Sequence, residues 1–146
     1  MNEPSVVVGL DGCDACQAAL RYACEEAGRR GCRLTVVAAY GRPGASAGNK
    51  VEAADSPAAA AHAVARQCLE LAGLTASSDG VDWHIVTKEM RPVDALAAVA
   101  HGAHAIVVGR HHGEPGGGKQ VGSTTSHLLN HSPIPVISVP PGYRQM

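Results

Sequence analysis

Residues 105–123 (AIVVGRHHGEPGGGKQVGS) have the types and spacing of an anion-binding loop. Four apolar residues lead into Gly109, a glycine-rich stretch follows, and a helical pattern begins at Ser123. Glycine lets backbone N–H groups approach a ligand closely, and a helix amino terminus presents unpaired donors and partial positive charge. The stretch therefore predicts a buried strand, a phosphate-sized loop and a helix start. A long surface loop without a ligand is the alternative interpretation.

A second phosphate-binding pattern lies inside the same loop. Residues 113–119 (GEPGGGK) match the first seven positions of the P-loop pattern G-x-x-x-x-G-K-[ST]. Gln120 stands where Ser or Thr would hold Mg²⁺, and the glycine run begins four residues after the predicted strand end. These departures argue against a true P-loop, although Lys119 can still meet a phosphate.

The cysteines offer a separate, thiol-based chemistry. Five cysteines form an odd set, which in a reducing compartment argues against a disulfide framework and for small buried residues on helices. Cys13 and Cys16 form a C-x-x-C pair at a strand–turn–helix junction, where a helix amino terminus lowers a thiol pKa. A reversible redox pair is one hypothesis. Otherwise Cys16 belongs to the core and Cys13 to the surface.

Eight histidines raise the question of a metal site. His111 and His112 are adjacent, and His127 and His131 have the i, i+4 spacing that can share a metal on a helix. No carboxylate or cysteine joins them at ligand spacing, so we predict solvated histidines and no metal site. No Ser-His-Asp or paired-carboxylate arrangement is recognisable either. The sequence favours a binding protein without catalytic residues.

Length and composition limit the class of protein. The 146 residues are 45% hydrophobic with a formal charge of −1, which predicts one globular domain over residues 1–146 and no nucleic-acid partner. The absence of Phe predicts an aliphatic, alanine-rich core and no base-stacking surface. No apolar stretch could span a bilayer and no secretion signal is recognisable, so we expect no membrane partner and a cytoplasmic protein.

Strands and helices alternate along the chain, with a long loop at residues 41–55. The predicted strands are residues 5–9, 32–40, 81–88, 105–108 and 135–139. The predicted helices are residues 13–30, 57–73, 92–102 and 123–131. Ser56 is the expected cap of the second helix, with Pro57 at its first position, and Gly31 and Gly73 are stop signals.

Apolar periodicity predicts which helix faces are buried. The positions expected to face the core are Cys16, Leu20, Ala23 and Ala27, then Ala61, Val64, Cys68 and Leu71, then Val93, Leu96, Ala97 and Ala100. Residues 81–88 alternate apolar and polar, as in an edge strand with one wetter face. The last strand is also expected at a sheet edge.

This order predicts a doubly wound α/β fold, with a five-stranded parallel sheet and helices on both faces. Ligands of such sheets bind beyond the carboxyl ends of the strands, where the strand order reverses. Two predicted strand ends carry suitable residues: Asp11 follows the first strand and Gly109 ends the fourth.

The assembled residues resemble the universal stress protein family, an adenine-nucleotide-binding branch of the adenine nucleotide alpha hydrolase-like fold. The resemblance covers nearly the whole chain and rests on VVVGLDG at residues 6–12, IVVG at 106–109 and GSTTSHLLNHSPIPVISVP at 122–140. The family's ATP-binding motif is Gly, two residues, Gly, nine residues, then Gly and Ser or Thr. Gly109, Gly122 and Ser123 match it, whereas His112 replaces the second glycine and can crowd the phosphates or ribose.

The resemblance implies an ATP site, with Mg²⁺ as a possible companion ion. Asp11 would contact the adenine edge, while Gly9 and Leu10 shape its pocket and Ala39, or else Ala38, lines the base. The other residues implied for the site are Val108, Gly109, His111, His112, Gly122, Ser123 and Thr124. From the residues alone, Asp11 is equally a turn residue that caps the first helix, and Ser123 a plain helix cap.

The functional hypothesis is therefore a stress-response regulator that binds an adenine nucleotide and hydrolyses ATP slowly at most. The resemblance also implies a homodimer through antiparallel pairing of the last strand, from Pro135 to Val139. One alternative is an interaction scaffold of the same fold that binds no nucleotide, which His112 favours. The other alternative is a thiol sensor that uses Cys13 and Cys16.

Overall fold

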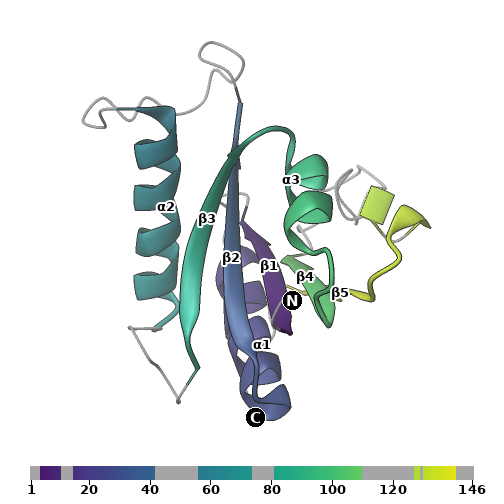
Figure 1. Cartoon of the computed structure of the whole chain (residues 1–146). Helices are drawn as coiled ribbons and strands as arrows, with labels where there is room; N and C mark the ends of the chain where they lie inside the picture. Colours follow the sequence, from purple (N-terminus) through teal and green to yellow (C-terminus); the bar gives the residue numbers. More distant parts are fainter. Residues whose placement is uncertain are drawn as a thin grey trace, which may run out of the picture.

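The computed structural model describes residues 4–10, 15–41, 56–73, 81–109, 127–128 and 130–140. Strands and helices alternate through most of this part of the chain (Figure 1). The elements are β1 (Ser5–Leu10), α1 (Ala15–Arg30), β2 (Arg33–Tyr40), α2 (Pro57–Leu71), β3 (Trp83–Glu89), α3 (Pro92–Val99), β4 (Ala105–Gly109) and β5 (Val136–Val139). Residues 127, 128, 130 and 131 are also helical, which places the end of the predicted fourth helix; its start lies outside the described residues.

The five strands form one parallel sheet in the order β3-β2-β1-β4-β5. Strand β1 is central, with Val8 paired to Val36 of β2 on one side and to Val107 of β4 on the other. The chain builds the sheet outward from β1 to β3 and then returns to add β4 and β5 on the other side. The predicted parallel sheet is confirmed, and β3 and β5 are its two edges.

Helices cover both faces of the sheet, and Figure 1 shows α1 behind the strands and α3 in front of them. Alternate residues of each strand serve the two sides, since side chains along a strand point to opposite faces. Val6 and Val8 pack with α1 and α2 in one cluster, the α1-side core. Val7 packs with α3 and Leu128 in a second cluster, the α3-side core. Aliphatic residues and alanine dominate both clusters, as predicted.

The signals for helix ends act as expected. The Ser56 hydroxyl accepts a hydrogen bond from the Ala59 N–H at 3.1 Å, and Pro57 opens α2. Gly31 and Gly73 follow their helices with positive φ angles of 65° and 81°, a conformation that glycine adopts at little cost. These residues fix where α1 and α2 end and where the chain returns toward the sheet.

Some predicted details are wrong. Leu71 is 59% exposed, because α2 turns Ala65 and Leu69 toward the sheet instead. Ala97 of α3 is also exposed, and Ala95 is buried in its place. In β3, residues 83–87 are all half-buried rather than alternating, since the edge position leaves both faces partly covered.

Strand β1 continues through Leu10, one residue beyond its predicted end. Leu10 is 9% exposed and belongs to the α1-side core, so burial keeps it in the extended strand.

No helix within the described ranges is long and apolar enough to cross a membrane.

Candidate functional site

The candidate site lies where the strand order reverses, at the carboxyl ends of β1 and β4. These strands are neighbours, yet the connections that leave them run toward opposite edges of the sheet. Strand β1 ends at Leu10 and β4 ends at Gly109, and the Val8–Val107 pairing places the two ends side by side. In doubly wound sheets, ligands bind in the crevice that opens at this reversal. The structure thus brings together the first and fourth strand ends, as the sequence predicts.

Small and apolar residues form the described part of this rim. Leu10, Ala38 and Val108 are nearly buried, at 9%, 7% and 5% exposure. Ala39 and Gly109 are half-buried at the ends of β2 and β4. Small and apolar residues are the usual lining of sites that bind the flat part of a ligand.

Gly9, which was predicted to shape a ligand pocket, also has a role in packing. A Cβ atom at Gly9 would lie 2.9 Å from Leu96 Cδ1 and 3.0 Å from Leu96 Cδ2. Leu96 is 2% exposed and belongs to the α3-side core. The missing side chain of Gly9 therefore lets α3 sit close to β1. Sequence periodicity identifies Leu96 as buried but not as the neighbour of Gly9.

Backbone electrostatics favour an anion at this end of the sheet. Each crossover helix starts near the carboxyl end of the preceding strand. For example, α1 begins at Ala15, shortly after β1 ends at Leu10. Helix amino termini carry partial positive charge, and within the described residues the first turns of α1 and α2 contain no acidic residue. The first turn of α3 does contain an acidic residue, Asp94, and Arg91 pairs with it. Arg91 Nε lies 2.8 Å from Asp94 Oδ2, and this hydrogen bond raises the pKa of Arg91.

Ser138 carries a polar group at the rim that the sequence prediction missed. It pairs in register with Val108, next to Gly109. Its Oγ atom is buried and has no hydrogen-bond partner in the part of the chain that the structure describes. A serine within an otherwise apolar strand is the only sequence signal for it.

Several predicted site residues lie outside the described part of the chain. They are Asp11, His111, His112, Gly122, Ser123 and Thr124. The second phosphate-binding pattern, residues 113–119, lies outside it as well. The structure therefore places Gly9, Leu10, Ala39, Val108 and Gly109 at one end of the sheet, and the assignment of all these residues to a ligand site stays a prediction.

The cysteine pair is also outside the described residues, since Cys13 and the side chain of Cys16 are not placed. Of the cysteines that are placed, Cys24 is buried on α1, whereas Cys32 and Cys68 are partly buried. Burial raises the pKa of the Cys32 thiol, which disfavours the reactive thiolate there. Of these three, Cys24 alone has the predicted buried position on a helix, because Cys68 is only partly buried and Cys32 precedes β2.

The sheet order and the helices on both faces define a class: doubly wound α/β proteins of the nucleotide alpha hydrolase-like fold. Within that class, the chain belongs to the universal stress protein family, whose family model matches residues 4–140. No curated protein sequence is significantly similar to the chain.

Solved structures of this family are similar to the chain over nearly its whole length. A universal stress protein in complex with cAMP is 26% identical, with a TM-score of 0.66, over 97% of this chain and 100% of that one. A universal stress protein from Archaeoglobus fulgidus in complex with dAMP is 25% identical, with a TM-score of 0.56, over 95% and 99%. UspA from Lactobacillus plantarum, at 22% identity, a TM-score of 0.68 and coverage of 95% and 99%, shows the fold alone.

Proposed function

We propose that this chain is a stress-response regulatory protein that binds an adenine nucleotide at the carboxyl ends of β1 and β4. The observation that carries the proposal is the position of Gly109, which ends β4 beside β1 at the point where the strand order reverses. Family membership supports it, as do relatives with bound cAMP and dAMP. The small, apolar rim suits an adenine ring, and the helix amino termini suit a phosphate.

In this proposal different residues contact different parts of the nucleotide. Leu10 and Ala39 line the base, with Asp11 at its polar edge, and Val108 and Gly109 lie under the ribose. Gly122, Ser123 and Thr124 contact the phosphates through backbone N–H groups and hydroxyls, with His111 and His112 in the same loop. ATP, with or without Mg²⁺, is the proposed nucleotide. No residue has a catalytic role, so hydrolysis is slow at most.

Calorimetric titration of the purified chain with ATP and Mg²⁺, ATP alone, AMP and cAMP tests the proposal. We expect micromolar binding of at least one nucleotide, and its loss in Gly122→Val, where side-chain bulk blocks the approach to the phosphates. His112→Gly restores the family motif and should tighten binding, by about tenfold if a clash of about 1.4 kcal/mol is relieved. Nucleotide released from denatured protein and measured by chromatography provides an independent readout.

Gly28→Ala is the matched control. Gly28 lies near the carboxyl end of α1, beside residues that start the strands, and therefore far from the proposed site. This variant should bind nucleotide like the unmodified chain. Absence of binding in the unmodified chain and in His112→Gly, with no co-purified nucleotide, would contradict the proposal and favour a scaffold that binds no nucleotide.

A further inference from the structure

A cavity on the α3 side of the sheet brings histidines together away from the strand ends. It has a volume of about 200 Å³ and lies between α3 and residues 127–134, with Ile106 of β4 also in its wall. Its apolar lining includes Ala100 and Leu128, both nearly buried. His101, His127 and His131 line it as well, and all three are exposed to solvent. The cavity thus combines an apolar wall with imidazole groups that solvent can reach.

His127 and His131 lie on the same side of one helical turn. The Ser132 N–H donates to the Leu128 carbonyl at 2.9 Å, which continues the helical hydrogen bonding past His131. The two imidazole rings are 4.5 Å apart between centroids and inclined at 42°. If two nitrogens bind the same metal ion at about 2.0–2.1 Å, they lie at most about 4.2 Å apart. Imidazole rings as close as these can reach that separation by rotation of their side chains.

We propose that His127 and His131 together bind a divalent transition-metal ion of the class that prefers imidazole, such as Zn²⁺, Ni²⁺ or Cu²⁺. Spacing of i, i+4 on a helix is the arrangement in which two histidines share one ion. Neutral imidazole is a preferred ligand of these metals, whereas Mg²⁺ and Ca²⁺ prefer oxygen. The proposal departs from the sequence prediction of solvated histidines without a metal, and it is independent of the proposed nucleotide site.

The neighbouring groups define what kind of site this is. Asp94 also lines the cavity, but its carboxylate is engaged by Arg91 at 2.8 Å and 3.4 Å. Across the described ranges, no three metal-binding side chains are grouped closely enough to hold an ion. Within the described part of the chain, the proposed ion therefore has two protein nitrogens as ligands, and water can fill its other positions. Such an open site binds its ion reversibly and leaves room for an additional ligand from solution.

Titration with Ni²⁺ alone, followed by calorimetry and by NMR of ¹⁵N-labelled histidine, tests the site. We expect the His127 and His131 ring signals to broaden together at substoichiometric Ni²⁺. His127→Ala and His131→Ala should each weaken this binding by about tenfold or more. Loss of a residue that merely hydrogen-bonds to a metal ligand already costs about tenfold, and a direct ligand should cost at least as much. Both rings are exposed, so both variants should keep the thermal stability of the metal-free chain.

Matched controls separate this site from the other histidines. His62→Ala and His104→Ala remove exposed histidines outside the cavity and should leave Ni²⁺ affinity unchanged. The double variant His111→Ala, His112→Ala should also keep the site. Unchanged affinity in both His127→Ala and His131→Ala, or loss of all binding in the His111, His112 double variant, would overturn the proposal.

Discussion

Gly9 shows how one missing side chain positions a whole helix. A Cβ atom there would meet both terminal carbons of Leu96, which the α3-side core surrounds. Gly9→Ala should therefore lower the free energy of unfolding by about 1–3 kcal/mol, as overpacking in a core does. Urea unfolding followed by circular dichroism measures this change.

Gly28→Ala is the matched control for Gly9→Ala. The added methyl group would lie 3.4 Å from Val81 Cγ2, an ordinary contact, and Gly28 is inside α1. Alanine is the better helix former, so this variant should gain about 0.5–1 kcal/mol. A loss of stability in Gly28→Ala as large as that in Gly9→Ala would show that contact with Leu96 is not the cause.

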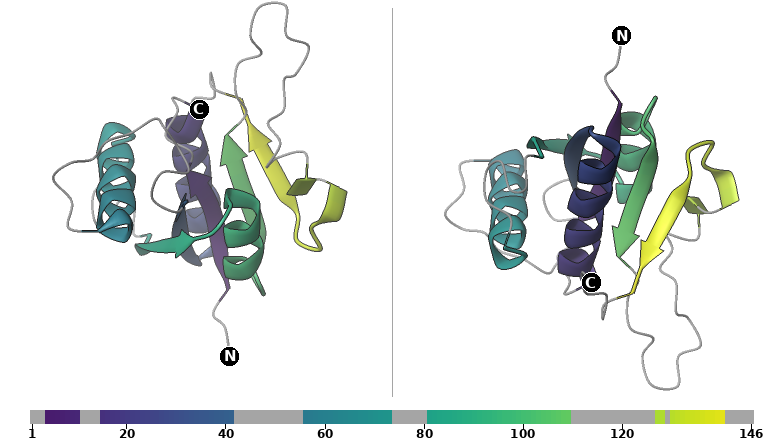
Figure 2. Two further views of the ribbon diagram at one scale, coloured as in Figure 1. Left: turned by 90° about the horizontal axis from the view of Figure 1, so that it is seen from above. Right: turned by 90° about the horizontal axis from the view of Figure 1, so that it is seen from below.

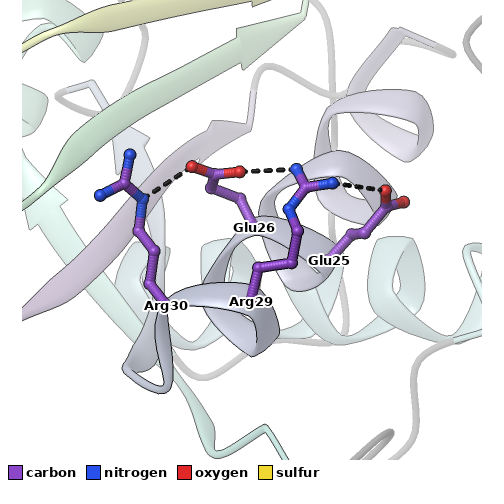
Figure 3. Close-up of polar contacts among 4 residues, drawn as sticks. All are labelled: Glu25, Glu26, Arg29 and Arg30. Atoms are coloured by element: carbon purple, nitrogen blue, oxygen red, sulfur yellow. Dashed lines mark hydrogen bonds and ion pairs between the residues drawn. The ribbon is translucent and has the colours of Figure 1, made fainter.

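At the scale of an element, the last turns of α1 are held by a chain of ion pairs (Figure 3). Glu26 accepts from Arg29 at 2.6 Å and from Arg30 at 2.7 Å, and Arg29 also reaches Glu25 at 3.1 Å. The side chain of Glu26 is 12% exposed, whereas both arginines remain largely in solvent. Hydrogen bonds from Arg29 and Arg30 lower the pKa of the Glu26 carboxyl.

This lowered pKa makes the contribution of Glu26 to stability dependent on pH. Because the carboxyl binds protons less tightly in the folded chain, its ionised form stabilises the fold above the unfolded pKa. The contribution is lost as pH falls through the folded pKa. Glu26→Gln should therefore destabilise the chain at pH 7 by the small amount typical of surface ion pairs, and by less at low pH. Urea unfolding at several pH values measures both differences.

Glu25→Gln is the control for the ion-pair chain. It leaves both contacts of Glu26 in place and removes the longer contact to Arg29, so it should cost less stability at pH 7 than Glu26→Gln. A destabilisation by Glu26→Gln that stays constant from pH 7 to low pH would contradict the proposed dependence on ionisation.

Helix α2 illustrates where prediction from sequence reaches its limit. Its existence and its start follow from Ser56 and Pro57, because capping is a local property. Its buried face does not follow, since alanine-rich sequence offers small residues on every side and periodicity alone admits more than one face. Packing on β2 and β3 selects Ala65 and Leu69 and leaves Leu71 exposed.

The whole sheet was predictable to a greater degree than the site. Runs of β-branched residues that alternate with helices determine a parallel sheet, and parallel strands bring their carboxyl ends to one rim. The ends of the first and fourth strands could therefore be expected to lie side by side. The close approach of Gly9 to Leu96 could not be predicted, because the two residues are far apart in the sequence and no local pattern encodes it.

The sheet edges bear on the homodimer that the family resemblance implies. β5 is an edge strand, and an unpaired edge presents N–H and carbonyl groups that another chain can pair with. Ile137→Lys should give a monomer with at least about tenfold weaker association, since it would place a charge on the strand that pairs in such a dimer. Sedimentation or light scattering measures the mass, and circular dichroism checks folding because Ile137 also packs on the α1-side core.

Thr87→Lys on β3, the opposite edge, is the matched control and should leave the mass unchanged. A folded Ile137→Lys chain that keeps the mass of a dimer, or a monomer formed by Thr87→Lys, would contradict pairing through β5.

Strand β1 lies inside the sheet, beside β4 (Figure 2), and this position also matters while the chain is being synthesised. In the complete sheet the side chains of three residues of β1 are fully buried: Val6, Val7 and Val8. One of the two strands that flank β1 is β4, which lies about 100 residues later in the chain. On the ribosome, β1 can pair with β2 soon after both emerge, but its other edge stays open until residues 105–109 have been made. An unpaired apolar edge in a nascent chain invites pairing with a neighbour. Premature termination before β4 should therefore yield aggregates rather than a smaller folded protein.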